Sequence, residues 1–280
     1  MSTRPLVIKI GGELLEDRAH LQTVVAAVAQ IASDRPRVII HGAGKEIDAG
    51  LKRAGLEKRQ VDGLRVTDEA TLDVVVAVLG AVNARLVAAL NAAGVAAVGL
   101  TGADAKCGLA DVAPPHRAAD GRVVDLGRVG VPSSDADVRL LDSLIRDGFV
   151  PVLACIGVGR DGRLLNVNAD TLAGYVAGRL SARRLVIAGT TPGVLGRNGE
   201  TLPTLESSAV AELVSSGTAT AGMVAKLRAC EHALAAGVDD VVIVDGRDTA
   251  AMVAAAENDN PPGATRLIGS ARTLAGELNR

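Results

Sequence analysis

Residues 6–15 read LVIKIGGELL, an apolar run that ends on the pair Gly11-Gly12. β-Branched residues followed by two glycines predict a β-strand that enters a tight turn. Lys9 interrupts this run, and an ammonium group inside a core strand is costly unless it has a partner. Two interpretations stay open: the side chain extends from the strand end into water, or it points across the glycine turn at an anionic ligand.

The same alternation of short apolar runs with Ala-rich segments of helical period continues along the chain. We expect strands at Leu6–Ile10, Val38–His41, Val95–Leu100, Val150–Ile156, Arg184–Ala188, Val241–Val244 and Arg266–Ile268. We expect helices at about 19–33, 44–54, 68–93, 134–147, 169–181, 206–216, 222–236 and 248–256. This order predicts an α/β fold with a mostly parallel sheet and helices on both faces. Ligands then bind beyond the carboxyl ends of the strands.

Composition narrows the classes of function. The 280 residues carry a net charge of −2, so nucleic acid is not an expected partner. Phe149 and Tyr175 are the only aromatic residues, which argues against base-stacking platforms. Cys107, Cys155 and Cys230 are odd in number and widely spaced, which favours a reducing cytoplasm over a disulfide framework or a zinc site. No apolar stretch is long enough to predict a membrane span or a signal peptide.

Two stretches interrupt the alternation of strands and helices. Residues 111–133 are rich in Pro, Gly and charge and predict an excursion of hairpins, and residues 157–165 predict a hairpin through Asp161-Gly162. The letters G-V-G-R-D-G at 157–162 match a dinucleotide fingerprint, but the residues after them read as extended rather than helical, so we reject it. We expect two lobes, 1–175 and 176–280, that share one continuous sheet.

Five glycine turns follow predicted strands directly. They are Gly11-Gly12, HGAG (41–44), GLTGAD (99–104), Gly157 and AGTTPG (188–193). Glycine lets backbone N–H groups approach a ligand closely, and a following helix N-terminus adds partial positive charge. Several such turns at one sheet edge can hold phosphate or carboxylate groups, although strand-to-helix connections also favour glycine for purely structural reasons.

Charged and amide residues near these turns are candidates for a functional role, and each also has a plain structural interpretation. Arg65, in DGLRVT (62–67), can grip a carboxylate in bidentate fashion or lie solvated in a loop. In NVNAD (166–170), Asn166, Asn168 and Asp170 precede or open a helix, where capping alone explains them. Lys226 lies early in an Ala-rich helix, where a surface lysine is the plain interpretation.

Taken in order, KIGGELL, VIIHGAG, DGLRVT, AVGLTGAD, PVLACIGV, NVNAD, PGVL and TAGMVAK make the chain resemble the amino acid kinase family, and within it the members that phosphorylate N-acetyl-L-glutamate. The series spans nearly the entire chain. The resemblance implies an open three-layer αβα sandwich. Its first lobe would bind the amino acid and dimerise, and its second lobe would bind ATP.

The resemblance also implies roles for single residues. Lys9 and Lys226 look like the two catalytic lysines that neutralise the transferring phosphoryl group, and Asp170 looks like the carboxylate that holds both. The positions that match the acyl amino acid site are Ala43, Gly44, Arg65 and Asn166. The positions that match nucleotide-binding segments are Gly11, Gly12, Thr190, Thr191, Gly193, Leu195, Thr218 and Thr220.

The implied reaction transfers the γ-phosphoryl group of ATP to the side-chain carboxylate of N-acetyl-L-glutamate, a step of arginine biosynthesis. Mg²⁺ would bind through the nucleotide phosphates, without a metal site on the protein. The acceptor is already ionised at neutral pH, which agrees with the lack of an evident catalytic base. Two alternatives are a kinase for a related acid, such as an N-modified aminoadipate, and a non-catalytic regulator with the same fold.

Three departures from the family pattern stand out. Ala43 replaces the middle one of three consecutive glycines, and Thr190-Thr191 stand where the family usually has an Asp. The chain also begins directly on its first predicted strand, without the N-terminal helix that accompanies arginine-inhibited hexamers in the family. We therefore expect a homodimer without strong arginine feedback.

Overall fold

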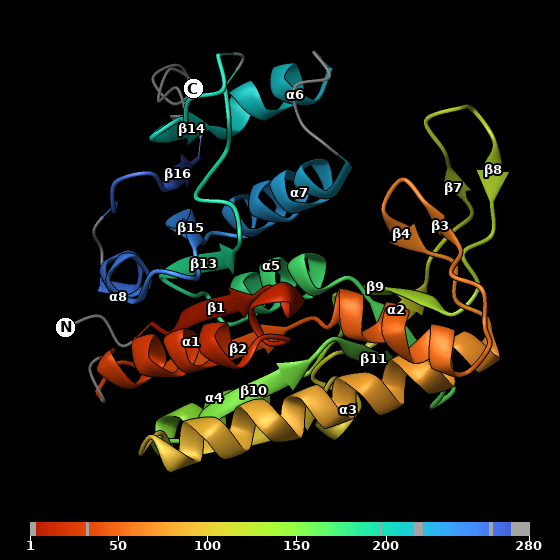
Figure 1. Ribbon diagram of the computed structural model, residues 1–280, viewed down its shortest axis with the longest axis horizontal. Helices are drawn as coiled ribbons and strands as arrows, with labels where there is room; N and C mark the ends of the chain where they lie inside the picture. The colour runs from red at the N-terminus through yellow and green to blue at the C-terminus, as the bar shows by residue number, and fades with distance from the viewer. Residues whose placement is uncertain (1–3, 32–33, 197, 216–220, 258–259, 270–280) are drawn as a thin grey trace, which may run out of the picture.

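The computed structural model describes residues 4–31, 34–196, 198–215, 221–257 and 260–269. Eight strands form its central sheet: β1 (Leu6–Ile10), β2 (Arg37–His41), β5 (Ala97–Thr101), β10 (Val150–Ala154), β13 (Arg184–Gly189), β14 (Thr204–Glu206), β15 (Asp240–Asp245) and β16 (Thr265–Ile268). Their order across the sheet is β14-β16-β15-β13-β1-β2-β10-β5 (Figure 1).

The sheet is parallel except where β15 pairs with β16. Strands β1, β2, β10 and β13 are buried along their whole length, as expected of parallel strands that are covered on both faces. The predicted α/β class with a mostly parallel central sheet is confirmed. Because β1 pairs with β13, the sheet is continuous from the first half of the chain to the second; the boundary between two lobes near residue 175 stays a prediction.

Helices cover both faces of this sheet. In chain order they are α1 (Arg18–Gln30), α2 (Gly44–Arg53), α3 (Glu69–Ala92), α4 (Arg139–Arg146), α5 (Ala169–Arg179), α6 (Ser207–Ser215), α7 (Ala221–Ala235) and α8 (Thr249–Glu257). Helix α1 packs against α3 and α8, and α5 packs against α7. Asp17, Asp68 and Asn168 cap α1, α3 and α5 by accepting backbone N–H groups of the first turn.

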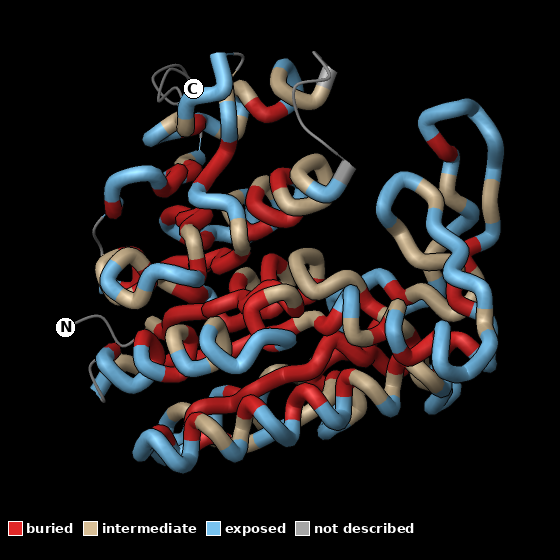
Figure 2. Tube along the Cα trace, viewed as in Figure 1, coloured by how far each residue is buried: buried red, intermediate tan, exposed pale blue. Residues whose placement is uncertain are grey.

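The two stretches that break the alternation form small β-structures. Strands β6 (Ala110–Val112), β9 (Val129–Pro132), β11 (Ile156–Val158) and β12 (Leu164–Val167) make a four-stranded sheet. Two hairpins, β3 (Gln60–Val61) with β4 (Leu64–Arg65) and β7 (His116–Arg117) with β8 (Val123–Val124), stand out from the body and are largely exposed at their tips (Figures 1 and 2). Both predicted excursions are confirmed, and Gly162 turns the second with φ +82°.

Two predicted boundaries differ most from the structure. The helix expected from residue 134 begins at Arg139, because Asp137 accepts hydrogen bonds from both the backbone N–H and the guanidinium of Arg139 and so ends the preceding turn. The strand expected at Val150–Ile156 divides at Cys155. Its first part pairs with β2 and β5 in the central sheet, whereas its second part pairs with β12 in the small sheet.

Helix α3 is the one helix in the described chain that is long and apolar enough to cross a membrane by length and composition. Its inner face nevertheless packs on the sheet, with Leu72, Val75, Leu79 and Leu86 buried. These contacts are those of a helix that packs with one face on a sheet.

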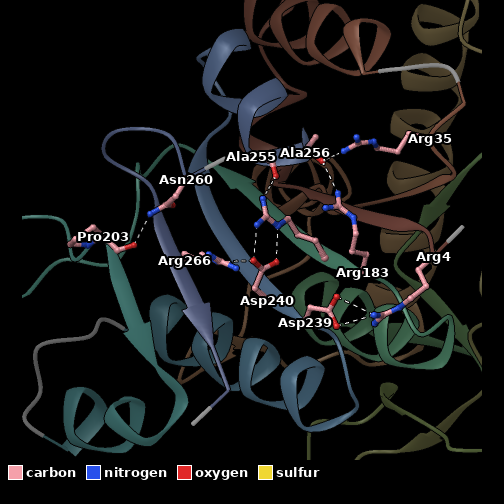
Figure 3. A network of polar contacts seen from close by, with 11 residues as sticks. Arg4, Arg35, Arg183, Pro203, Asp239, Asp240, Ala255, Ala256, Asn260 and Arg266 are labelled. Carbon is pink, nitrogen blue, oxygen red and sulfur yellow. Dashed lines mark hydrogen bonds and ion pairs between the residues drawn. The ribbon is translucent and has the colours of Figure 1, made fainter. Parts of the chain in front are cut away.

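A polar network at the amino ends of β13 and β15 ties distant segments together (Figure 3). Arg184 and Asp240 are 3% and 4% exposed and form a bidentate pair with both N···O distances at 2.6 Å. Arg266 adds a third bond to Asp240. Nearby, Arg35 and Arg183 both donate to the carbonyl of Ala256, at the end of α8. The network lies at the sheet edge opposite the predicted site.

Candidate active site

Lys9 does not extend into water. It lies in β1 between Ile40 and Ile187 of the two flanking strands and is only 8% exposed. Its Nζ is 2.9 Å from Oδ1 of Asp170. Burial alone would lower the pKa of Lys9, but the Asp170 carboxylate, with a smaller contribution from Glu13, raises it above the usual value. The ammonium group is therefore charged and held in a fixed position.

Asp170 is free to pair with Lys9 because another residue caps its helix. The side chain of Asn168 accepts the backbone N–H of Thr171, which satisfies the first turn of α5. Asp170 lies in the same turn with its side chain 13% exposed. Helix capping thus explains Asn168 but not Asp170, whose position is explained by its ion pair with Lys9.

Lys226, on α7, approaches the same point from the second half of the chain. A Cβ added at Gly189, the last residue of β13, would lie 3.5 Å from Nζ of Lys226. Burial, and then the positive charge of Lys9, lower the pKa of Lys226, while Asp170 acts in the opposite direction. The structure therefore brings Lys9, Asp170 and Lys226 into one electrostatic cluster at the carboxyl ends of β1 and β13.

The glycine turn after β1 fits tightly against the turn after β2. A Cβ at Gly12 would lie 2.7 Å from Cα of Ala43 and 2.9 Å from N of Gly44, closer than side chains approach backbone. The N–H of Gly11 donates to the carbonyl of Ala188, so this amide continues the sheet and is not available to a phosphate. The N–H of Gly12 and the first amides of α2, which begins at Gly44, have no such partner within the described residues.

His41, in the HGAG turn, is a structural residue. It is fully buried, and burial lowers its pKa to about 4. Its Nε2 lies 3.0 Å from Nδ2 of Asn83, which also donates to the carbonyl of Val152, and its Nδ1 lies 3.3 Å from the carbonyl of Gly42. A neutral ring satisfies this arrangement with Nδ1 as donor and Nε2 as acceptor. His41 thereby fixes the loop that carries Ala43 and Gly44.

Arg65 and Asn166 form a second group beside the first. The Arg65 side chain is 8% exposed, is paired with Asp48 of α2, and has Nη2 3.4 Å from the carbonyl of Gly44. Its Nη1 is buried and has no hydrogen-bond partner in the described part of the chain. Asn166 donates to Oγ1 of Thr67, which donates in turn to the carbonyl of Arg65. A buried guanidinium nitrogen without an acceptor is suited to an anionic ligand.

The predicted nucleotide segment after β13 begins beside this cluster and leads away from it. Thr190 follows Gly189, and its carbonyl accepts a bond from Arg247. Thr191 and Leu195 are exposed, whereas Gly193 is buried, and a Cβ there would lie 2.5 Å from Oγ1 of Thr265. Thr218 and Thr220 lie outside the described residues. The assigned roles of all these positions stay predictions.

Sequence reasoning missed two carboxylates in the site. Glu13 follows the glycine pair, and its Oε1 would lie 2.4 Å from a Cβ at Gly11 and 3.2 Å from one at Gly189. Asp48 accepts from both Arg65 and Lys58, whose hydrogen bonds outweigh the effect of burial and hold the pKa of Asp48 below its usual range. Their signals were an acid directly after a glycine pair and an acid one turn into a helix that opens on a glycine turn.

The residues of this site fit a nucleoside triphosphate better than a metal ion alone. Two lysines lie at the carboxyl ends of β1 and β13, and the glycine turn after β1 packs against the N-terminus of α2. Such an arrangement suits phosphate oxygens. No group of three or more His, Cys, Asp and Glu side chains within the described residues could hold a metal ion. A Mg²⁺ ion at this site would therefore need phosphate oxygens among its ligands. A hollow of about 980 Å³ lies at the amino edge of the sheet around Arg37, Arg146 and Phe149, away from this cluster.

Comparison with solved structures supports the same fold. N-acetylglutamate synthase from Neisseria gonorrhoeae, in complex with coenzyme A and N-acetyl-glutamate, matches with a TM-score of 0.79 and 25% identity over 96% of this chain, which spans 60% of that one. Carbamate kinase from Giardia lamblia bound to AMP-PNP matches with a TM-score of 0.68 and 14% identity, covering 96% of this chain and 100% of that one. The second likeness concerns the fold alone.

Sequence relatives are closer. The acetylglutamate kinase of Novosphingobium aromaticivorans is 38% identical over 261 residues, 89% of this chain and 86% of that protein. The acetylglutamate kinase of Acidiphilium cryptum is 40% identical over 250 residues, 86% of this chain and 83% of that protein. The model of the amino acid kinase family matches residues 4–245. Because the family model and the sequence relatives each match most of its length, the chain belongs to the amino acid kinase family.

Proposed function

We propose that the protein transfers the γ-phosphoryl group of ATP to the side-chain carboxylate of N-acetyl-L-glutamate and forms N-acetyl-L-glutamyl 5-phosphate. The observation that carries this proposal is the pairing of two sites. A cluster of two lysines lies at the carboxyl ends of β1 and β13. The buried guanidinium of Arg65, with Nη1 lacking a partner within the described residues, contacts Gly44, which packs against the glycine turn after β1. The substrate follows from the named relatives, which are acetylglutamate kinases.

The difficulty of this reaction is charge. The acceptor carboxylate is ionised near neutral pH and must approach an anionic phosphate. Lys9 and Lys226 would neutralise the charge that spreads over the transferring group, and the Gly12 amide and the N-terminus of α2 would donate to its oxygens. Asp170 would position Lys9 through the 2.9 Å ion pair. Mg²⁺ supplies further charge neutralisation when it arrives with the nucleotide.

Arg65 would orient the acceptor. Its Nη1 and Nη2 form a fork, of which Asp48 already fixes one side. A carboxylate of the substrate that meets Nη1 would be held close to Gly44 and to the turn fixed by His41. Asn166, tied to the same strand through Thr67, would bind other polar groups of the acyl amino acid. Thr190, Thr191, Gly193 and Leu195, with Thr218 and Thr220, would bind the nucleotide.

The location of these groups supports two lobes with separate tasks. The residues proposed for the amino acid lie in 1–175, and those proposed for the nucleotide lie mainly in 176–280. Lys9 and Lys226 come from the two lobes and would meet at the phosphoryl group. The three cysteines are free and buried, which suits a reducing cytoplasm, where arginine biosynthesis would use this step.

We also propose a homodimer through α3 and the edge strand β5. The outer face of α3 carries small apolar residues, and only 28% of its most apolar window is buried. Within the described residues, strand β5 ends the sheet and pairs there with β10 alone. An apolar helix face beside an open strand edge is normally covered. Replacing Ala84, exposed in mid-helix, by Arg should convert the dimer to a monomer in light scattering after gel filtration.

The central test measures ADP release with Mg-ATP and a panel of acids: N-acetyl-L-glutamate, N-acetyl-L-aspartate, N-acetyl-L-2-aminoadipate and free L-glutamate. We expect the highest kcat/KM with N-acetyl-L-glutamate. Clear turnover of another acid alone would replace the substrate and keep the reaction type. Nucleotide binding without turnover of any acid would support a non-catalytic regulator instead.

A further inference from the structure

Glu13 lies at the point where phosphate oxygens are expected. It is the first residue after Gly11-Gly12, in the short helical turn Gly12–Leu14. Its carboxylate lies over Gly11, since a Cβ at Gly11 would be 2.4 Å from Oε1 and 2.6 Å from Oε2. It also reaches across to β13, where a Cβ at Gly189 would be 3.2 Å from Oε1. The two glycines therefore make room for the carboxylate of Glu13.

The Glu13 carboxylate also balances the positive charge of the lysine cluster. Lys226 Nζ and Glu13 Oε1 both lie beside Gly189, and the negative charge of Glu13 acts on Lys9 and Lys226 alike. Two ammonium groups therefore face two carboxylates, those of Asp170 and Glu13. Asp170 is held in its ion pair with Lys9. The Glu13 side chain has no hydrogen bond within the described residues, and Glu13 is partly exposed between the buried Gly12 and Leu14.

The Glu13 carboxylate at this position would repel the phosphates of a nucleotide. Without a metal, the phosphates of a nucleotide carry several negative charges and would meet the lysines only against the repulsion of Glu13. With Mg²⁺, the complex carries two positive charges more, and a carboxylate oxygen is a ligand that Mg²⁺ accepts together with phosphates. Glu13 thus acts against the metal-free nucleotide and not against the magnesium complex.

On the basis of the nucleotide site in the proposed function, we infer that Glu13 makes nucleotide binding depend on Mg²⁺ by facing the phosphates with a negative charge. The residue is a specificity determinant for the metal complex. It also balances Lys226 when no phosphate is bound, since a like-charged pair of buried lysines is costly.

The test compares the affinity for ADP with excess Mg²⁺ and with EDTA by isothermal titration calorimetry. The proteins are the wild type, Glu13→Gln, Glu13→Ala and the control Glu16→Gln. Glu16 is the next acid along the chain, with its side chain 23% exposed and its Oε2 3.8 Å from Nζ of Lys45. The measured quantity is the dissociation constant of ADP in EDTA divided by that in excess Mg²⁺. We expect this ratio to fall by roughly tenfold in both Glu13 variants, mainly because metal-free ADP binds more tightly. In Glu16→Gln the ratio should stay at the wild-type value.

Each outcome decides the inference. The same ratio in all four proteins, with Mg-ADP bound normally, overturns the role of Glu13 and leaves the proposed function intact. A fall in Glu16→Gln equal to that in the Glu13 variants also overturns it, since the effect then belongs to net charge. Lack of ADP binding by the wild type under both conditions overturns the inference together with the nucleotide site. Two different replacements of Glu13 separate loss of charge from disturbance of the turn.

Discussion

Replacing Asp170 by Asn removes one charge from the cluster and nearly preserves the shape of the side chain. Lys9 and Asp170 are 2.9 Å apart, with side chains 9% and 13% exposed. At an effective dielectric constant of about 20, their attraction is about 6 kcal/mol. Desolvation offsets part of it, and breaking one partner of a buried pair costs about 3–5 kcal/mol. We expect Asp170→Asn to lower the free energy of unfolding by that amount.

Urea unfolding of a double-mutant cycle tests this value. The cycle contains Lys9→Met, Asp170→Asn and the double variant, and the two single losses should exceed the double loss by at least about 2 kcal/mol. The control cycle uses Arg4 and Asp239, a pair 38% and 57% exposed, for which coupling of about 0–1 kcal/mol is expected. A Lys9–Asp170 coupling no larger than that of the control pair would refute the reasoning.

The pH dependence gives an independent check. In the wild type the pKa of Lys9 is raised, because Asp170 and Glu13 outweigh burial. Its contribution to stability is therefore complete below the unfolded pKa of about 10.5 and is lost as pH rises through the folded value. In Asp170→Asn, burial is no longer offset by the Asp170 charge and should lower that pKa. The folded variant should therefore release the proton at a lower pH and gain stability as pH rises. The stability gap between the two proteins should narrow from pH 8 to pH 10.5.

Four further expectations follow from single residues. Lys226→Ala should lower kcat by about 10²-fold in the ADP-release assay, as for other lost transition-state donors; near-normal kcat would contradict its role. Arg65→Ala should raise KM for the acyl amino acid at least about tenfold and change kcat less, whereas an unchanged KM would remove Arg65 from the substrate site. Gly12→Ala should destabilise the protein by about 1–3 kcal/mol in urea, because its Cβ would meet Ala43 backbone at 2.7 Å; in Gly80→Ala, an open position on α3, the change should be neutral or stabilising, and equal effects would refute the packing argument. His41, with its pKa lowered to about 4 by burial, contributes stability that is complete above the unfolded pKa of about 6.5 and is lost as pH falls toward 4. Between pH 6.5 and pH 4, the free energy of unfolding of the wild type, measured by thermal unfolding, should therefore fall by about 1.4 kcal/mol per pH unit more than that of His41→Gln. The same pH dependence in both proteins would show that His41 is not neutral in the fold.

The fold could be predicted from the sequence because its signals are local. The apolar run of β1 and the glycine pair after it are adjacent in the chain, as are Asn168 and the helix it caps. The predictions failed where pairing partners decide the outcome. Cys155 reads as the continuation of an apolar strand, but the chain leaves the central sheet there because β12 offers a second partner for residues 156–158.

The site could be predicted only in part, for the same reason. Local patterns left Lys9, Asp170 and Lys226 with ordinary explanations, and only the family resemblance joined them. The structure adds the missing physical link: β1 and β13 are neighbours in register, so Lys9 pairs with Ile187 and lies two residues along that strand from Gly189. Lys226 then reaches the same point from α7.

Arg65 and Glu13 differ in how far the sequence indicated their roles. The sequence indicated that Arg65 could bind a carboxylate, but its buried Nη1 depends on Asp48 and Gly44, which lie 17 and 21 residues away along the chain. Glu13 had only the weaker signal of an acid directly after a glycine pair, and an acid beside a phosphate site contradicts the simple rule that anions are bound by cations. The rule holds for the complete charge balance rather than for each residue. Two lysines beside one carboxylate would attract any phosphate, whereas two lysines beside two carboxylates can require that the phosphate bring its own cation.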